Sequence, residues 1–140
     1  MNEGDPDKVR ARITDLLAHP ALFSQFYADV LRNFDAPESV LSTLQQYYAD
    51  KNAVWPDKLQ EIATLAAYFG FPEFSLLVIS EEVQHSPLRL PALWHPVMAS
   101  VRRLDGFNKL VEDLRLTAYW QKYGWADSFQ PLDDNDFVCS

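Results

Sequence analysis

The chain has 140 residues with 20 acidic and 12 basic side chains, a formal net charge of −8, and 48% hydrophobic residues. That hydrophobic content excludes a disordered chain, and the length suits one domain with a substantial core. The negative charge repels nucleic-acid phosphates, and the one cysteine, Cys139, excludes a disulfide framework within the chain.

We expect a cytoplasmic protein that neither binds nucleic acid nor enters a membrane. Residues 1–8 are polar and acidic and lack the apolar core of a signal peptide. The longest strictly apolar run, 76–79, is far too short to span a membrane. A single cysteine also fits a reducing compartment.

Proline and aspartate mark the starts of the first helices expected along the chain. Asp5-Pro6 has the residue types of a helix cap and first position, and the helix is expected to end before His19-Pro20. A second helix is expected over 21–33 and a third over 37–50, with Asp35 as the cap of the third. Apolar residues recur at helical spacing in all three, so each helix is expected to bury one face.

The next two helices are expected to form a pair around a short bend. Pro56 begins the fourth helix in this interpretation, and Gly70 ends it. Pro72 begins the fifth helix, which Ser86-Pro87 stops because the residue before proline avoids the helical conformation.

The bends at 34–41 and 69–76 share the pattern F-x-x-P-E-x-x-L at a distance of 35 residues. Such a period, built from helix, bend and helix, is typical of a helical repeat array. It predicts a third helix pair, and Pro96 is expected to shorten or kink the first helix of that pair. The shift carries Leu59, Ile62, Ala63 and Ala66 onto Trp94, Val97, Met98 and Val101. The competing interpretation is that any two amphipathic helices share such spacing.

A last helix is expected over 117–123, followed by an acidic, flexible tail over 131–140. The predicted fold is therefore all-α, with stacked antiparallel helix hairpins in about three pairs plus terminal helices. Residues 1–130 form a single domain in this interpretation.

Residues 56–87 resemble a degenerate tetratricopeptide repeat. Gly70 falls at the bend of that motif, Ser75 at the small position of its second helix and Pro87 at its closing proline, whereas Glu82 replaces an expected alanine. The packing positions of its first helix are taken by Leu59, Ile62, Ala63 and Ala66, and the large apolar position of its second helix by Ile79. The resemblance implies a tetratricopeptide-like right-handed superhelix.

The C-terminal part resembles the end of bacterial signalling proteins in which a tetratricopeptide array follows a winged-helix DNA-binding domain or a nucleotide-cyclase domain. The similarity runs from Leu93-Trp94-His95-Pro96 through 104–110 and Leu116 to 119–127. It departs at 126–129, where Ala-Asp-Ser-Phe replaces the frequent Pro-Asp-Phe-Cys. These 140 residues supply neither of the two other domains. The resemblance therefore implies a regulatory or scaffolding module, free-standing or C-terminal in a longer chain.

No group of residues has the pattern of a catalytic or metal site, so we expect no enzyme activity, no cofactor and no metal. The histidines His19, His85 and His95 lack the i, i+4 spacing of a helical zinc site, and two of them precede proline as helix-end residues. The acidic run 133–136 lacks the glycine and glutamate of a calcium loop. The chain also lacks a nucleophile elbow and a phosphate-binding glycine loop.

Stacked helix pairs bind partners on the concave surface lined by their first helices. In the register above, this groove presents Gln25, Asp29, Arg32, Asn33, Gln60, Thr64, Tyr68, His95, Arg102 and Arg103. Its three arginines are candidates to hold a carboxylate of a bound peptide through charge-assisted hydrogen bonds. The alternative is that these residues are only the solvated faces of amphipathic helices.

Five aromatic residues near the C-terminus allow two interpretations. They are Trp94, Tyr119, Trp120, Tyr123 and Trp125. They form a hydrophobic cap if they close the open end of the array, because a terminal repeat must hide an exposed face. They form a binding hot spot if they stay exposed, since Trp and Tyr bury much area with few rotatable bonds.

The sequence therefore predicts a non-catalytic protein-interaction or regulatory scaffold module, a signalling accessory in a bacterial cytoplasm, whose partner is a protein or peptide. One alternative is a self-assembling structural homodimer that pairs through exposed ends of the array. A second alternative is a small-molecule sensor with a pocket between helices.

Overall fold

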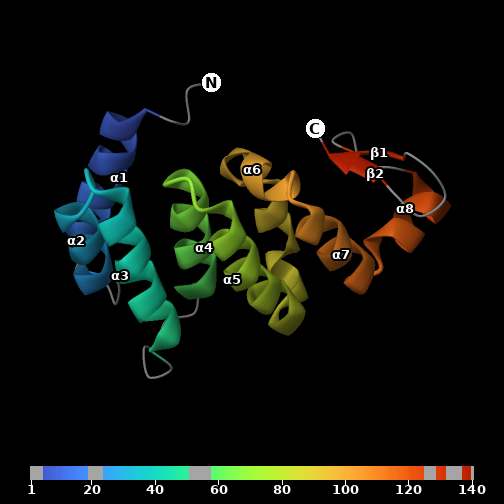
Figure 1. Cartoon of the computed structure of the whole chain (residues 1–140), viewed down its shortest axis with the longest axis horizontal. Helices are drawn as coiled ribbons and strands as arrows, with labels where there is room; N and C mark the ends of the chain where they lie inside the picture. Colours follow the sequence, from blue (N-terminus) through green and yellow to red (C-terminus); the bar gives the residue numbers. More distant parts are fainter. Residues whose placement is uncertain (1–4, 19–23, 51–57, 125–128, 132–136, 140) are drawn as a thin grey trace.

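The computed structural model describes residues 5–18, 24–50, 58–124, 129–131 and 137–139 (Figure 1). Most of these residues are helical, and two short strands lie near the C-terminus, so the all-α prediction is confirmed. The helices are α1 (Pro6–Ala18), α2 (Ser24–Arg32), α3 (Pro37–Ala49), α4 (Lys58–Tyr68), α5 (Pro72–His85), η1 (Pro87–Trp94), η2 (Pro96–Met98), α6 (Ala99–Arg102), α7 (Asp105–Asp113) and α8 (Leu116–Tyr123). They follow one another along the long axis, with α1 to α3 at one end and α8 at the other.

The helix caps agree with the sequence at α1 but not at α3. Asp5 caps α1 as predicted, because its Oδ1 accepts a hydrogen bond of 3.1 Å from the Asp7 backbone N–H. Asp35 does not cap α3. Since Pro37 occupies the first helical position, the cap position falls on Ala36, which makes no side-chain cap hydrogen bond. Asp35 instead forms an ion pair of 2.8 Å with Arg10 of α1.

Gly70 ends α4 as predicted and turns the chain into α5. Its φ of +91° is a backbone conformation that residues with a Cβ rarely adopt. The Phe71 N–H donates to the Ala66 carbonyl at 2.8 Å, and the Gly70 N–H donates to the Ala67 carbonyl at 3.2 Å. These two bonds satisfy carbonyls at the end of α4, as glycine-terminated helices commonly do.

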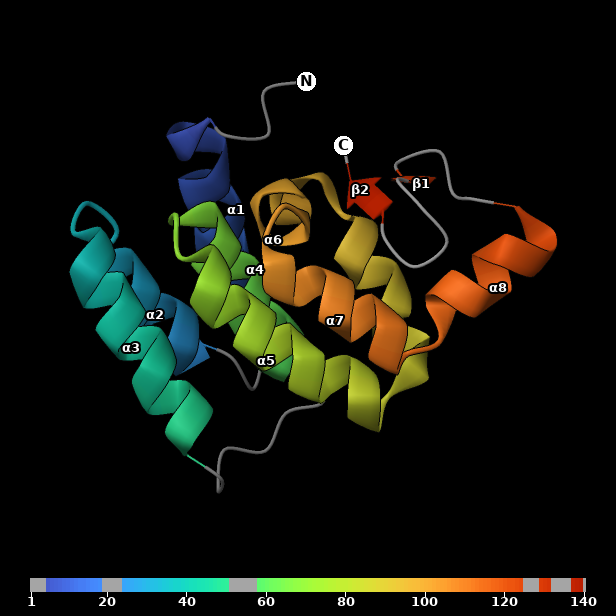
Figure 2. The same cartoon turned by 45° about the vertical axis from the view of Figure 1, so that its right-hand side comes forward.

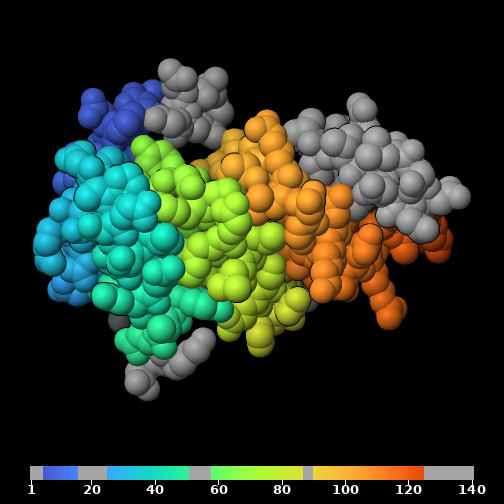
Figure 3. Space-filling model, viewed as in Figure 1, coloured from blue at the N-terminus to red at the C-terminus, as the bar shows by residue number. Residues whose placement is uncertain are grey.

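The two bends that share the F-x-x-P-E-x-x-L pattern lie side by side. The rings of Phe34 and Phe69 pack edge to face, with centroids 5.2 Å apart. Between α4 and α5, the fully buried Ser75 hydroxyl donates to the Ala63 carbonyl at 2.6 Å. The hairpins share one core, and their surfaces follow without a gap from cyan through green to orange in Figure 3. The core includes Phe26, Leu44, Ile62, Ile79, Leu93, Met98 and Phe107, all nearly inaccessible to solvent.

The first helix of the predicted third pair is not one continuous α-helix. Two 3₁₀ helices, η1 and η2, and the single turn of α6 take its place. Pro91 lies inside η1 and Pro96 begins η2, and each proline removes a backbone donor that an α-helix needs. Met98 and Val101 are nevertheless buried, so the predicted spacing survives at these positions. The second helix of the pair is α7, which lies along α5 (Figure 2).

Leu76 and Leu77 on α5 provide a test of the packing between α5 and α7. Leu76 is half-buried, and its Cδ2 lies 3.0 Å from the point where a Cβ would stand on Gly106 of α7. We expect Leu76→Ala to lower the free energy of unfolding by about 2 kcal/mol, the low end for a core leucine, because burial is partial. The matched control, Leu77→Ala, removes a side chain that is 55% exposed and is expected to cost less than about 0.5 kcal/mol. Urea denaturation measures both, and equal losses would contradict this packing.

Two strands that the sequence pattern does not predict lie near the C-terminus. β1 (Phe129–Pro131) and β2 (Phe137–Cys139) pair antiparallel, with Gln130 opposite Val138. They include Pro131 and 137–139 from the segment expected to be a flexible tail. Residues 132–136 and 140 lie outside the described residues.

Hydrogen bonds between tyrosine and carboxylate side chains connect successive hairpins. The Tyr27 hydroxyl on α2 donates to Glu61 on α4 at 2.8 Å. The Tyr48 hydroxyl on α3 donates to Glu81 on α5 at 2.6 Å. The partners are 34 and 33 residues apart, close to the period of the sequence pattern. Each bond therefore joins a helix to its counterpart in the next hairpin.

We expect Tyr47 and Tyr48, both on α3, to make the chain less stable at alkaline pH. The hydrogen bond to Glu81, together with burial, raises the pKa of Tyr48 from 10.0 to about 12. Burial, together with the hydrogen bond to Asp29, raises the pKa of Tyr47 to about 12. Between pH 10 and 12 the unfolded chain loses these protons while the folded chain keeps them, so the stability that is present below pH 10 falls.

Urea denaturation at pH 9, 10, 11 and 12 measures this effect. We expect the double variant Y47F/Y48F to be about 2 kcal/mol less stable than the unmodified chain at pH 7, because it lacks two hydrogen bonds to carboxylates. Its free energy of unfolding is expected to fall less steeply above pH 10, since it lacks both titrating hydroxyls. The same alkaline slope in both proteins would contradict the pKa shifts.

Candidate functional site

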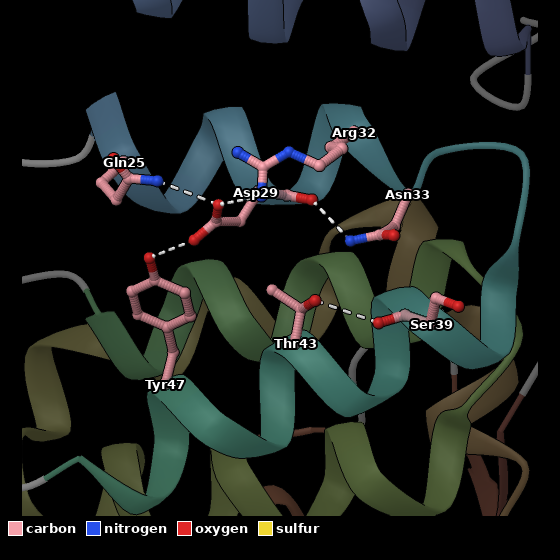
Figure 4. A network of polar contacts seen from close by, with 7 residues as sticks. All are labelled: Gln25, Asp29, Arg32, Asn33, Ser39, Thr43 and Tyr47. Atoms are coloured by element: carbon pink, nitrogen blue, oxygen red, sulfur yellow. Dashed lines mark hydrogen bonds and ion pairs between the residues drawn. The ribbon is translucent and has the colours of Figure 1, made fainter.

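Four residues of the predicted groove lie together on and just after α2 (Figure 4). The Asp29 carboxylate is their centre: it accepts from Gln25 Nε2 at 2.9 Å and from the Tyr47 hydroxyl at 2.7 Å, and it lies 3.2 Å from Arg32. Asn33 Nδ2 donates to the Asp29 carbonyl at 3.0 Å. These groups hydrogen-bond one another, and the bond from Tyr47 to Asp29 joins α3 to α2. Gln25 and Arg32 are the members of the predicted groove that are exposed here.

Three other groove residues line a pocket of about 430 Å³ between α4 and η1. The pocket is partly open to solvent. Gln60, Glu61 and Thr64 of α4 form one wall, and the other wall is formed by Pro91, Ala92, Trp94 and His95. The structure thus brings the predicted residues Gln60, Thr64 and His95 together with one of the predicted aromatic residues, Trp94.

Hydrogen bonds fix several of the pocket's polar side chains. The Tyr27 hydroxyl donates to Glu61 Oε2, and the Thr64 hydroxyl donates to the Gln60 carbonyl at 2.8 Å. His95 Nδ1 accepts from the Val97 N–H at 3.3 Å and so caps η2, which requires an unprotonated Nδ1. Its predicted place at a helix end is confirmed. Among the described residues that line the pocket, Glu61 carries the formal negative charge and no Lys or Arg is present.

Tyr68 belongs to the packing between hairpins and does not line the pocket. Its ring lies 5.0 Å from that of Phe69 and 6.4 Å from that of Phe34, measured between centroids. Burial raises the pKa of its hydroxyl, and the negative charge of Asp5 adds to that effect. Tyr68 is therefore half-buried beside the rings of both bends.

The structure separates the two arginines at the end of the predicted groove. Arg102 is only 8% exposed, and its NH1 donates to the carbonyls of Leu93 at 2.9 Å and His95 at 3.1 Å. The interpretation of Arg102 as a groove cation is thus wrong, because its guanidinium folds back to satisfy the turn between η1 and η2. Arg103 is exposed and stays a candidate for contact with a partner.

The aromatic residues of the set differ in their exposure to solvent. Trp120 is 6% exposed and packs edge to face against Trp94, with centroids 6.3 Å apart, so this pair closes the core. Tyr119 and Tyr123 are 57% and 64% exposed on α8, with centroids 4.8 Å apart. Trp125 lies outside the described residues.

The sequence pattern does not predict three of the residues that line the pocket, Glu61, Pro91 and Ala92. Glu61 directly follows the predicted Gln60. Its carboxylate is held by the hydroxyl of Tyr27 in the preceding hairpin, and periodicity alone does not distinguish one carboxylate on a helix from another. Pro91 and Ala92 lie in η1, where a helical register does not apply. The distance of about one period between Tyr27 and Glu61 is the signal that could have identified this carboxylate.

No family model, curated protein or solved structure matches the chain. Across the parts of the chain that the structure describes, no cluster of three or more His, Cys, Asp or Glu side chains could hold a metal ion. Within the same residues, no helix combines the length and apolar character needed to cross a membrane.

Proposed function

We propose that the chain is a non-catalytic protein-interaction module of the tetratricopeptide-like type, which binds an extended peptide segment of a partner. The observation that carries the proposal is the pocket between α4 and η1, where three predicted groove residues meet Trp94. Its size lies at the low end of the range for ligand pockets, which suits one side chain of a longer ligand. Amide, hydroxyl and indole groups suit recognition of a peptide.

The tetratricopeptide-like superhelix is part of the same proposal. Its support is the contact between Phe34 and Phe69 at equivalent bends, together with the close packing of Ser75 on Ala63 at the positions where that motif has small residues. The tyrosine bonds from each hairpin to the next provide further support. A regular stack would give its first helices a common face, and this proposal puts Gln60 and Thr64 of α4 on that face.

A library of random linear peptides displayed on phage tests the proposal even though the partner is unidentified. Selection on the immobilised chain is expected to enrich peptides that bind with micromolar Kd. Thr64→Tyr, which fills the pocket from a half-buried position, is expected to weaken them at least tenfold. Thr14→Tyr is the matched control, because Thr14 is also a helical threonine that donates to the carbonyl four residues earlier, but on the exposed face of α1.

Two outcomes would overturn the proposal. One is that selection enriches no peptide above the background of the uncoated surface. The other is that Thr64→Tyr and Thr14→Tyr bind the selected peptides equally well. Circular dichroism of both variants verifies that neither substitution has unfolded the chain.

A homodimer is the second candidate function, favoured by the exposed Tyr119 and Tyr123 on α8. Two such pairs could stack across a twofold axis, because tyrosine buries a large area with little loss of side-chain entropy. Light scattering during size-exclusion chromatography tests it. The expected result for this candidate is a dimer that Y119S/Y123S converts to a monomer, and a monomer at every concentration would exclude it.

A further inference from the structure

We infer that the pocket between α4 and η1 binds a cationic side chain, that of lysine or arginine, from the partner peptide. This inference rests on the proposed function and specifies the chemistry of the ligand. It follows from the one carboxylate among the residues that line the pocket, the way that carboxylate is held, and the apolar wall opposite.

Glu61 is oriented before any ligand arrives. Its Oε2 accepts from the hydroxyl of Tyr27, and Tyr27 is itself only 4% exposed, with its ring packed against Phe26 at a centroid distance of 5.2 Å. A carboxylate offers about four acceptor positions on two oxygens. One hydrogen bond from Tyr27 therefore fixes the side chain and leaves acceptor capacity for a charged donor.

The opposite wall suits the rest of a long cationic side chain. Pro91 and Ala92 present apolar surface. The methylene groups of a lysine or arginine side chain can cover this surface while its charged end stays near the Glu61 carboxylate. Trp94 adds an indole, the aromatic side chain that attracts cations most strongly. A lysine or arginine side chain can therefore place its stem against η1 and its charge at α4.

Charge disfavours the other classes of side chain at this position. An acidic side chain would meet the like charge of Glu61. An apolar one would exclude water from that carboxylate and add no hydrogen bond to the one from Tyr27, which is costly. Arg102 is hydrogen-bonded to the carbonyl of His95, but it does not line the pocket. The net charge of −8 attracts a cationic segment at longer range.

Titration of the isotope-labelled chain with single amino-acid amides tests the inference by NMR. The probes are Nα-acetyl-arginine amide, Nα-acetyl-lysine amide and Nα-acetyl-citrulline amide at millimolar concentration. Citrulline has nearly the shape of arginine without its charge. We expect the two cations to shift the backbone signals of 60–64 and the indole N–H of Trp94, and citrulline to shift them at least fivefold less at equal concentration.

Glu61→Gln is the variant that removes the charge and keeps an acceptor for Tyr27. It is expected to reduce the shifts caused by arginine amide at least fivefold. Glu81→Gln is the matched control, because Glu81 also accepts from a tyrosine of the preceding hairpin but does not line the pocket. This control is expected to respond to arginine amide like the unmodified chain.

The outcomes separate this inference from the function on which it rests. Equal shifts from arginine and citrulline, or no shifts at the pocket, would overturn the cationic assignment, and so would an unchanged response of Glu61→Gln. If Thr64→Tyr still weakened selected peptides that lack Lys and Arg, the interaction function would stand without this assignment. If no peptide were selected while arginine amide shifted the pocket signals, the pocket would bind cations but the peptide function would fall.

Discussion

Phe107→Ala is expected to lower the free energy of unfolding by about 3–5 kcal/mol, the range for removing a fully buried aromatic ring. Phe107 is 0% exposed in α7, so alanine would leave a cavity that a close-packed interior fills only in part. A loss of this size approaches the total stability of many small domains. Urea denaturation followed by tryptophan fluorescence and by circular dichroism measures it.

Tyr119→Ala is the matched control for this substitution. It also removes an aromatic ring from a C-terminal helix, but Tyr119 is 57% exposed, so we expect a change below about 0.5 kcal/mol. Coincident transitions by the two probes would show that α7 unfolds together with the N-terminal hairpins. A cost below about 1 kcal/mol for Phe107→Ala, at the bottom of the range for core substitutions, would mean that α7 does not belong to the shared core.

Arg102→Met is expected to cost about 3 kcal/mol, although it changes a charged residue on a short helix. Methionine keeps the apolar volume of the stem but removes the donor to the carbonyls of Leu93 and His95. Buried acceptors that lose their donor cost about 1–3 kcal/mol each. Trp94 lies between these two carbonyls in the chain, so its fluorescence reports the loss of the turn, and urea denaturation gives the magnitude.

Arg103→Met tests the contrast at the neighbouring position. Arg103 is exposed, and its replacement is expected to change the free energy of unfolding by less than about 0.5 kcal/mol. Similar costs at 102 and 103 would show that the hydrogen bonds of Arg102 contribute little. A joint replacement of both arginines by glutamate is also expected to disrupt the turn, because glutamate cannot donate to the carbonyls of Leu93 and His95.

Local signals in the sequence account for the parts of the fold that they predict. Asp5, Gly70 and Pro72 act through the backbone of their own turn, so their effects do not depend on distant residues. Ser75, which the resemblance places at the small position of its helix, contacts α4 through its hydrogen bond to the Ala63 carbonyl. In contrast, the cap of α3 lies one residue beyond Asp35, since Pro37 sets the first helical position.

The rest of the site depends on contacts between segments that periodicity does not bring together. A helical register predicts Arg102 beside Arg103 on a groove, but the prolines of η1 and η2 produce a turn whose carbonyls draw the guanidinium inward. The same irregular segment forms one wall of the pocket. The predicted groove therefore keeps Gln60, Thr64 and His95 at the pocket, whereas Tyr68 and Arg102 become part of the packing.

The hydrogen bonds from Tyr27 and Tyr48 link the first hairpin, α2 and α3, to the second, α4 and α5. Separation of the first hairpin from the second would break both hydrogen bonds, that of Tyr27 on α2 and that of Tyr48 on α3. We therefore expect the amide hydrogens of α2 and α3 to exchange with solvent in one cooperative event. A cation held by Glu61 acts at the same boundary, because that carboxylate also receives Tyr27. Binding of a cation in the pocket is therefore expected to change the hydrogen-exchange rates of the amides of α2, although α2 does not line the pocket.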